Sequence, residues 1–380
     1  MKLHHIANQH MAPASGEEIP VIDPSTGLVF EAIARGNATD IDRAVGAARA
    51  AFNGAWGQLS ATERGRLLHR LSQHMLAHMD ELAAIESRDC GKPTKQARAD
   101  ALALVRYFEF YAGACDKLHG DTIPYLDGYS VLTWREPHGV TGHVIPWNYP
   151  MQIFGRSVGG ALAAGNACVV KPAEDACLSL IRVAQLAAEV GFPAGAINIV
   201  TGYGHEAGDA LARHPGIDHI SFTGSPRVGT LIQQVAAQRH CPVTLELGGK
   251  SPNIFFEDVA RTEDAFYDKA LEGFNMFALN QGEVCTCPSR ALIDAPIYDK
   301  FLADAMVRTK AIIQGNPLDT VTMIGAQASN DQLEKILSYI EIGKQEGAKL
   351  LMGGHRVDLG GDLSGGYYVA PTVFEGTNNM

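Results

Sequence analysis

Residues 140–171 read VTGHVIPWNYPMQIFGRSVGGALAAGNACVVK, and this stretch decides the fold. A short apolar run at 140–145 ends in a turn with two prolines, a helical segment follows at 151–164, and a second apolar run begins at Ala167. A strand, a turn, a helix and a strand in this order form a crossover unit that joins two parallel strands. We therefore expect a parallel sheet to begin here.

The same pattern repeats as far as residue 249. We predict strands at 140–145, 167–171, 197–200, 219–222 and 243–247, and helices at 151–164, 178–190, 206–213 and 226–238. Short apolar strands that alternate with helices are typical of a doubly wound, Rossmann-like α/β sheet. Such sheets bind ligands at the carboxyl ends of their strands, so the turns that follow the strands are the candidate sites.

The flanking segments carry their own signals. Thr39-Asp40-Ile41-Asp42 and Ser60-Ala61-Thr62-Glu63 resemble capping boxes that open helices. Asp127-Gly128 lies between two short apolar runs, which predicts a β-hairpin over 120–136 with a two-residue turn. The other helices are expected near 80–91, 95–117, 261–279, 296–314 and 329–346. The last three predict a second α/β domain.

The composition is that of a globular protein. Of 380 residues, 46% are hydrophobic and 19% are charged, which excludes intrinsic disorder as the main state. The formal net charge is −11 and no run of five like charges occurs, so nucleic acid is not an expected partner. The 40 glycines predict many tight turns or close backbone approaches.

Seven cysteines are scattered without the spacing of a disulfide framework. They predict reduced thiols in a cytoplasmic protein. The first 20 residues contain no apolar export signal. The longest apolar run, 158–170, is broken by Asn166 and is too short for a bilayer core of about 30 Å, so no membrane partner is expected.

The turn after the fourth predicted strand reads Phe222-Thr223-Gly224-Ser225-Pro226-Arg227-Val228-Gly229. A glycine-bounded loop that opens a helix presents free N–H groups and a positive dipole end, which favour a phosphate. The same pattern also fits an ordinary glycine-rich turn. It is not a P-loop, because Thr230 and Leu231 follow where Lys and Ser/Thr would be required.

Two other strand ends carry polar side chains. Asn148 lies between Pro146 and Pro150, where its amide could donate to an oxyanion or simply stabilise a rigid turn. Lys171 and Glu174 follow the second strand and could hold a ribose diol, although a surface ion pair fits the spacing equally well.

Two further residues are candidates for chemistry. Glu246 is the single carboxylate in the apolar run 243–247, which favours a general base, but a turn glutamate is the alternative. Cys285 and Cys287 form a C-x-C pair with no nearby histidine, so a zinc site is excluded and no metal is expected. Cys285 remains either a nucleophile or an inert buried cysteine.

Taken together, the motifs resemble those of the aldehyde dehydrogenase superfamily, in the right order from Asp23 to Met380. They are Pro146-Trp147-Asn148, Lys171-Pro172-x-Glu174, Phe222-Thr223-Gly224-Ser225, Glu246-Leu247-Gly248-Gly249-Lys250 and Asn280-x-Gly282-x-x-Cys285. The resemblance implies that Cys285 is the nucleophile, Glu246 the general base and Asn148 part of the oxyanion hole. The implied reaction oxidises an aldehyde to the carboxylate through a thiohemiacetal and a thioester, with hydride transfer to NAD.

The resemblance also implies the cofactor residues. They are Ile145, Pro146, Trp147, Lys171, Glu174, Gly204, Phe222, Thr223, Gly224, Ser225, Gly229 and Leu247. A carboxylate at Glu174 accepts hydrogen bonds from a ribose diol but repels a 2′-phosphate, so we expect NAD in preference to NADP.

Substrate choice follows from a departure from the family pattern. Members often have Gly-Gln-x-Cys, whereas this chain has Gly282-Glu283-Val284-Cys285, as in bacterial enzymes that act on acetaldehyde and other short aliphatic aldehydes. The implied substrate lining is Tyr149, Ile153, Leu279, Val284 and Thr286. The alternatives are a coenzyme-A-acylating or semialdehyde-specific dehydrogenase of the same fold, and an inactive nucleotide-binding or structural protein.

By the same resemblance, residues 1–117 and 138–249 form a dinucleotide-binding domain and 250–380 a catalytic domain. Residues 118–137 resemble an oligomerisation hairpin, which predicts a homodimer or homotetramer. Family members continue past the motif corresponding to Asn378-Asn379-Met380, so we expect the catalytic domain to be incomplete.

Overall fold

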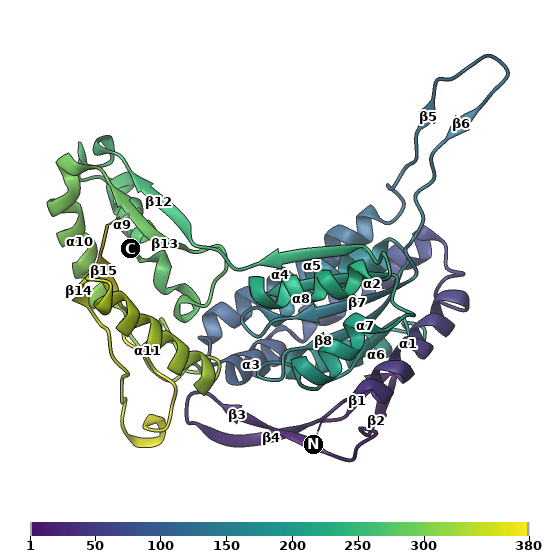
Figure 1. Ribbon diagram of the computed structural model, residues 1–380, viewed down its shortest axis with the longest axis horizontal. Helices are drawn as coiled ribbons and strands as arrows, with labels where there is room; N and C mark the ends of the chain where they lie inside the picture. Colours follow the sequence, from purple (N-terminus) through teal and green to yellow (C-terminus); the bar gives the residue numbers. More distant parts are fainter. Residues whose placement is uncertain (1, 378–379) are drawn as a thin grey trace. The chain divides into compact units, whose positions relative to one another are not determined.

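The computed structural model describes residues 2–377 and 380 (Figure 1). Residues 378 and 379, near the end of the predicted catalytic domain, lie outside the described residues. The chain forms two compact units. Unit 1 consists of Met1–Val21, Val29–Glu86 and Ala97–Glu246, and unit 2 consists of Ile22–Leu28, Ser87–Gln96 and Leu247–Met380.

Unit 1 is built on a seven-stranded sheet. Its strands are, in spatial order, β11 (Val243–Leu247), β10 (His219–Gly224), β7 (Val140–Ile145), β8 (Ala167–Pro172), β9 (Ile197–Ile199), β1 (His4–Ile6) and β2 (Gln9–Met11). Strand β7 is parallel to β10 and β8, and β8 is parallel to β9. Strand β1 is antiparallel to both β9 and β2.

The five predicted strands and their parallel arrangement are confirmed. For β11 the direction follows from its first residues, because Ile220 N–H donates to the Pro242 carbonyl (3.0 Å) and His219 Nε2 lies 3.1 Å from Thr244 Oγ1. The starts of β10 and β11 are therefore side by side. Strands β1 and β2 carried no sequence prediction; they are joined by Ala7 and Asn8, which have φ of 52° and 59°.

Helices cover both faces of this sheet, because consecutive side chains of a strand point to opposite faces. At Gly142 of β7, a Cβ atom would lie 3.3 Å from the side chain of Leu211 in α7 (Asp209–Arg213). The next residue, His143, instead contacts Ser157 of α5 (Pro150–Ala163). The predicted doubly wound α/β fold is confirmed.

The remaining helices of the first 246 residues match the predicted segments closely. They are α1 (Ala38–Asn53), α2 (Ala61–Ala77), α3 (Met79–Cys90), α4 (Thr94–Ala114), α6 (Leu178–Glu189) and α8 (Pro226–Ala237). The predicted helix at 206–213 is instead a π-helix, η1 (Gly204–Gly208), that continues into α7. Strands β3 (Glu18–Asp23) and β4 (Leu28–Ala34) pair in a separate two-stranded sheet.

The capping box predicted at Ser60 is confirmed, whereas the box predicted at Thr39 is formed by Asn37 and Asp40. Ser60 caps α2 and Glu63 closes its box. The cap of α1 is Asn37 and not Thr39, because the Asn37 side chain accepts from the Thr39 N–H and the Asp40 side chain accepts from the Asn37 N–H. The helix therefore begins earlier than the sequence predicted.

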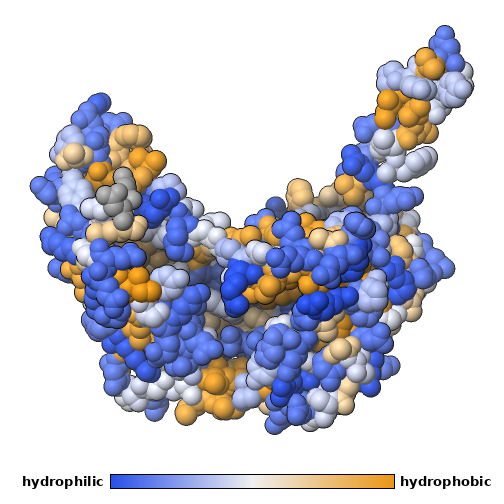
Figure 2. All heavy atoms as spheres, viewed as in Figure 1, coloured by the Kyte–Doolittle hydropathy of each residue, from blue (hydrophilic) through white to orange (hydrophobic). Residues whose placement is uncertain are grey.

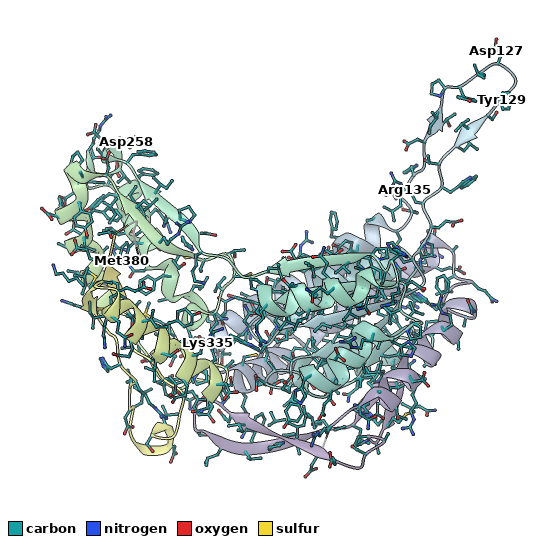
Figure 3. All side chains as sticks on the ribbon, in the orientation of Figure 1. Asp127, Tyr129, Arg135, Asp258, Lys335 and Met380 are labelled. Atoms are coloured by element: carbon teal, nitrogen blue, oxygen red, sulfur yellow. The ribbon has the colours of Figure 1, made fainter. Side chains whose placement is uncertain are left out.

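The predicted hairpin is present and extends from unit 1 (Figure 1). Its paired strands, β5 (Thr122–Ile123) and β6 (Val131–Leu132), are short. The predicted two-residue turn at Asp127-Gly128 is present, since the Tyr129 N–H donates to Leu126 O across it (3.1 Å) and Gly128 has a φ of 85°. The paired residues end before this turn, so residues 124–130 join the two strands. Figure 3 shows Asp127 and Tyr129 at the far end of the hairpin and Arg135 near its base.

Unit 2 contains two small sheets and three α-helices among its described residues. Strand β12 (Ser251–Phe255) is parallel to β13 (Pro288–Ile293), and β14 (Lys349–Met352) is antiparallel to β15 (Val373–Glu375). The helices are α9 (Ala265–Asn275), α10 (Tyr298–Lys310) and α11 (Asn330–Gln345), with short helical turns η2 (Glu257–Ala260), η3 (Met276–Gly282), η4 (Ala295–Ile297) and η5 (Gly361–Leu363). The fully buried Phe301 packs with Phe255, Tyr267 and Phe274 in its core.

The predicted helix at 261–279 is shorter in the structure. Asp264 caps α9 by accepting from two backbone N–H groups, and the helix ends at Asn275. Beyond it, Asn280 and Gln281 have φ of 49° and 58°, which no α-helix can contain. This break lies directly before Cys285.

Candidate active site

The turn after β7 carries Asn148 at the carboxyl edge of the sheet. Pro150 takes the first position of α5, where a missing N–H costs nothing. Asn148 is half-buried, and Tyr149 is the N-cap residue. The Ala173 N–H donates to Ile145 O (2.8 Å), which ties the turn after β8 to the end of β7. The residues after both strands therefore lie together.

A buried carboxylate that the sequence did not reveal holds this edge. Glu86 of α3 is fully buried and accepts from the Met151 N–H (3.2 Å) and the Ser179 hydroxyl (3.0 Å). Met151 is in the first turn of α5 and Ser179 in the first turn of α6, so Glu86 joins the two helix starts. In the sequence, the only indication of this role was that Glu86 lies among apolar residues of the helix predicted near 80–91.

Beneath the strand ends, a buried polar chain links three elements. In β7, His143 Nε2 lies 2.8 Å from Thr141 Oγ1, and His143 Nδ1 lies 2.6 Å from Ser157 Oγ of α5. The Ser157 hydroxyl donates in turn to Ser221 Oγ of β10 (3.0 Å). Burial lowers the pKa of His143 to about 3, so the ring is neutral at physiological pH. These side-chain hydrogen bonds connect β7 to α5 and β10.

Lys171 and Glu174 form an ion pair after β8. Lys171 Nζ donates to Glu174 Oε2 at 2.7 Å, and the lysine is buried whereas the carboxylate is half-buried. The pair thus offers one cationic donor and one anionic acceptor at the same place. A diol, which both donates and accepts, requires this combination.

The turn after β9 leads into the short helix η1, and the turn after β10 leads into the longer helix α8. Gly204 begins η1, and a Cβ atom there would meet open space. Ser225 caps α8 with its hydroxyl, and Pro226 is the first helical residue. At Gly224 a Cβ atom would lie 2.5 Å from the Phe222 ring, so a larger residue there would force this ring to move. Thr223 is half-buried beside it, and Gly229 is buried in the first turns of α8.

Glu246 and Leu247 end β11, the edge strand of the sheet. Both are exposed, as is Thr244 of the same strand. The edge strand β11 is therefore more exposed than the inner strands β7 and β8, whose residues are mostly buried. Gly248, Gly249 and Lys250 follow it as an exposed turn.

In unit 2, Cys285 lies in a turn between η3 and β13. The turn closes with a hydrogen bond from the Cys287 N–H to Val284 O (3.4 Å). Cys285 and Val284 are half-buried, and Thr286 is exposed. Leu279, also half-buried, lies at the start of the left-handed stretch that leads to the turn.

The two cysteines of this turn differ in their surroundings. Cys287 is buried, its thiol donates to Met276 O at 2.9 Å, and burial together with the charge of Cys285 raises its pKa. The seven cysteines all lie within the described residues, and none of them is in a disulfide bond. Burial raises the pKa of Cys168 to about 12. Cys285 and Cys241 alone are half-exposed.

The proposed site residues fall on both units. Asn148, Glu246, Tyr149, Ile153 and every cofactor candidate except Leu247 belong to unit 1. Tyr149 and Ile153 are adjacent in space, since the Ile153 N–H donates to Tyr149 O (3.0 Å). Unit 2 holds Leu247, Leu279, Val284, Cys285 and Thr286.

Residues 2–377 and 380 contain no cluster of three or more His, Cys, Asp or Glu side chains that could hold a metal ion. Within the same residues, every helix is too short or too polar to cross a membrane.

The fold and these strand ends define a class: a doubly wound α/β protein with a capped, glycine-bounded helix start at the carboxyl edge of its parallel sheet. Comparison with known proteins narrows this class. Residues 10–380 match the aldehyde dehydrogenase family, and the chain belongs to that family.

Three relatives illustrate the similarity. The chain is 55% identical over 377 residues to fluoroacetaldehyde dehydrogenase of Streptantibioticus cattleyicolor, covering 99% of this chain and 74% of that protein. It is 50% identical over 379 residues to acetaldehyde dehydrogenase 2 of Cupriavidus necator, with the same coverage. The NAD⁺ complex of aldehyde dehydrogenase from Bacillus cereus has a TM-score of 0.94 and 37% identity, covering 100% of this chain and 76% of that one.

The difference in burial predicts an order of thiol reactivity. At pH 8, iodoacetamide should label Cys285 first and Cys241 second, because burial raises the pKa of Cys241. Cys168, with a pKa of about 12, keeps a thiolate fraction on the order of 10⁻⁴ at that pH and should stay unlabelled. Peptide mass mapping measures the rates.

The control is the same reaction in denaturant, where all seven cysteines should label at comparable rates. Labelling of Cys287 or Cys168 in the native protein as fast as Cys285 would contradict the assignment of Cys285 as the reactive thiol.

Proposed function

We propose that this protein oxidises a short aliphatic aldehyde to the carboxylate, with NAD as the hydride acceptor. The observation that carries the proposal is the match to the aldehyde dehydrogenase family along residues 10–380. Two relatives at 55% and 50% identity are named for fluoroacetaldehyde and acetaldehyde, which both contain two carbons. Their names support a small substrate.

The proposed nucleophile is Cys285. Its thiolate attacks the carbonyl carbon, and a thiohemiacetal forms with a negatively charged oxygen. The Asn148 amide and the Cys285 backbone N–H donate hydrogen bonds to this oxygen and lower the barrier. The half-buried position of the free Cys285 supports this role, since a nucleophile must be reached by its substrate.

Glu246 is the proposed general base. Loss of hydride from the thiohemiacetal carbon leaves a thioester on Cys285, and NAD, when bound, accepts that hydride. Glu246 then takes a proton from the water that attacks the thioester, which frees the carboxylate and the thiol. The exposed position of Glu246 allows water to reach it.

The residues at the carboxyl edge fit NAD. Lys171 and Glu174, 2.7 Å apart, match the donor and acceptor needs of a ribose diol. The first N–H groups of α8, after Gly224 and Ser225, suit a phosphate, and that helix has no acidic residue in its first turn. The other proposed contacts are Ile145, Pro146, Trp147, Gly204, Phe222, Thr223, Gly229 and Leu247. The NAD⁺ complex of the Bacillus cereus relative supports this cofactor.

Tyr149, Ile153, Leu279, Val284 and Thr286 are the proposed substrate lining. Tyr149 and Ile153 are buried at the start of α5, next to Asn148. Apolar side chains suit a short alkyl group, because its burial is favourable and few polar contacts are needed. We propose the same domains as the sequence predicted: a dinucleotide-binding domain over 1–117 and 138–249, which also supplies Asn148 and Glu246, and a catalytic domain over 250–380 that carries Cys285.

The proposed assembly is a homodimer or homotetramer held through the hairpin at 118–137, in the cytoplasm. Tyr125, Leu126, Tyr129 and Trp134 are 67%, 62%, 69% and 79% exposed, and Figure 2 shows apolar residues along this arm. An isolated two-stranded hairpin is marginally stable in water unless something covers it. A second copy of the chain is the proposed cover. The free cysteines agree with a reducing compartment.

Two variants test the catalytic roles. Cys285→Ala should abolish aldehyde-dependent NADH formation and still bind NAD, because the cofactor residues are unchanged. Glu246→Gln should retain a rapid first turnover of NADH and lose about 10²–10⁴-fold in steady-state rate, since only thioester hydrolysis needs the base. Stopped-flow absorbance measures both.

Product analysis with and without coenzyme A accompanies these variants. Formation of an acyl-CoA product would overturn the role of Glu246 and favour a coenzyme-A-acylating enzyme. A wild-type protein that binds NAD without any turnover would support a nucleotide-binding role instead of an enzyme.

Cofactor choice is a separate prediction. Wild type should have a higher kcat/KM with NAD than with NADP, because the Glu174 carboxylate repels a 2′-phosphate. Glu174→Gln removes this repulsion and should raise the NADP to NAD ratio of kcat/KM by roughly tenfold, a change of about 1.4 kcal/mol. Equal or better kcat/KM with NADP in wild type would contradict the proposal.

Assembly through the hairpin predicts a change in mass. Multi-angle light scattering at micromolar concentration should show a dimer or tetramer for wild type. A Leu126→Glu, Trp134→Glu double variant should shift toward monomer, because it places charge on the surface to be covered. Asp127→Asn, at the turn of the same hairpin, is the matched control and should keep the wild-type mass. A monomeric wild type would rule out this assembly.

A further inference from the structure

The backbone before Cys285 contains three consecutive left-handed residues. Asn280, Gln281 and Gly282 have φ of 49°, 58° and 82°. Glycine adopts this conformation freely, but each residue with a side chain is destabilised there by on the order of 1–3 kcal/mol. Such a stretch persists only where surrounding contacts determine it.

Those contacts come from a segment more than 40 residues away. The Gly325 N–H donates to Gln281 Oε1 (3.3 Å), and Gln327 Nε2 donates to the Gln281 carbonyl (3.2 Å). The Ala328 N–H donates to the Glu283 carboxylate at 3.0 Å. Three hydrogen bonds therefore fasten the residues before Cys285 to 325–328.

The segment 325–328 is itself fixed. The Gln327 N–H donates to Tyr367 O at 2.8 Å. At Gly325 a Cβ atom would lie 1.8 Å from Gly91 O, so the two backbones are in direct contact. Ser329 follows and caps α11 by accepting from a backbone N–H of the first turn. Because these contacts hold residues 325–328 in place, the Ala328 N–H is a fixed hydrogen-bond donor for Glu283.

Glu283 is an unusual residue for this place. Glu283 is buried, with only 6% of the residue exposed. Burial of a carboxylate is costly unless hydrogen bonds compensate, whereas a glutamine accepts the same N–H bond at lower cost. A hydrogen bond from an N–H to a charged acceptor is in turn stronger than one to a neutral acceptor. The carboxylate therefore strengthens the fastening two residues before Cys285.

We propose that Glu283 is a positioning residue: by accepting the Ala328 N–H it holds the left-handed stretch and so sets the direction in which the backbone presents Cys285. The proposal rests on the proposed function, in which Cys285 is the nucleophile. Glu283 acts through residues 283–285 and not on the reacting atoms. A misplacement of about 1 Å at a reacting group can lower a rate about 10²-fold, so a loose turn should be visible in kcat.

The test compares Glu283→Leu with Glu283→Gln. Both variants remove the charge and are similar in size, but glutamine alone keeps an acceptor for Ala328. Relative to Glu283→Gln, Glu283→Leu should lose about 10- to 100-fold in kcat with KM for NAD within about twofold, because the cofactor residues are remote in sequence from this turn. A loss of folded protein would also lower the apparent kcat at unchanged KM, so the rates of both variants are normalised to the folded fraction measured by circular dichroism.

A second readout needs no turnover. Iodoacetamide labelling of Cys285 without cofactor or aldehyde should be about fivefold slower in Glu283→Leu than in Glu283→Gln, with Cys241 in the same sample as the internal reference. Glu283→Asp, which keeps the charge but shortens the reach, should behave like Glu283→Leu. It provides a second variant if Glu283→Leu fails to fold, as judged by circular dichroism.

Two results overturn the proposal: a Glu283→Leu variant with the kcat and Cys285 labelling of Glu283→Gln, or a Glu283→Gln variant as impaired as Glu283→Leu. If wild type shows no aldehyde oxidation, the proposed function fails, and the labelling comparison still decides whether Glu283 positions Cys285.

Discussion

The parallel register of β10, β7 and β8 is the constraint on which the cofactor side of the molecule depends. Val144 pairs with both Phe222 and Lys171, so three strands end at the same level. Because side chains alternate along a strand, a slip of one residue in β8 would exchange Lys171 with Val170 and turn the cation to the opposite face. In the observed register Lys171 lies near the end of β8, where it forms the ion pair with Glu174.

Helix starts meet the same edge, and they are not equivalent. The start of α5 receives the buried carboxylate of Glu86, which satisfies one of its N–H groups and opposes its positive dipole end. Asp209 and Glu206 lie in the first turns of α7 and η1. The first turn of α8 contains no acidic residue. Its N-cap is the neutral Ser225 hydroxyl, which accepts from the Val228 N–H, so the positive dipole end of α8 agrees with the phosphate contact proposed for this turn.

How far the sequence predicts the structure depends on the distance over which each signal acts. The five parallel strands of the main sheet and the cap at Ser60 were predicted, because apolar runs and capping boxes are local, whereas β1 and β2 were not. Asn37 was missed as a cap, since a neighbouring threonine offered the same chemistry. The roles of Glu86 and Glu283 were missed because their partners are 65 and 45 residues away. The segments 22–28 and 87–96 carry no local signal that they cluster with 247–380.

The candidate site shows the same contrast. Asn148, Lys171, Glu174 and Ser225 follow regular strands, so their place at one edge could be argued from the sequence alone. The turn at Cys285 could not be derived in this way, because its backbone is irregular. A helix predicted as far as residue 279 ends at Asn275, and left-handed residues replace it. The shape of this turn is set by residues 325–328, which no local pattern connects with it.

The turn also explains how two cysteines so close in sequence can differ in chemistry. The Cys287 thiol is buried and donates its proton to Met276 O, and both burial and the charge of Cys285 raise its pKa. A thiolate at Cys285 thus makes ionisation of Cys287 less favourable, so the two thiols do not ionise independently. The hydrogen bond from the Cys287 thiol to Met276 O favours the protonated form of Cys287. Of the C-x-C pair, Cys285 is thus the more accessible thiol, which agrees with the proposal that it is the nucleophile and that Cys287 is not.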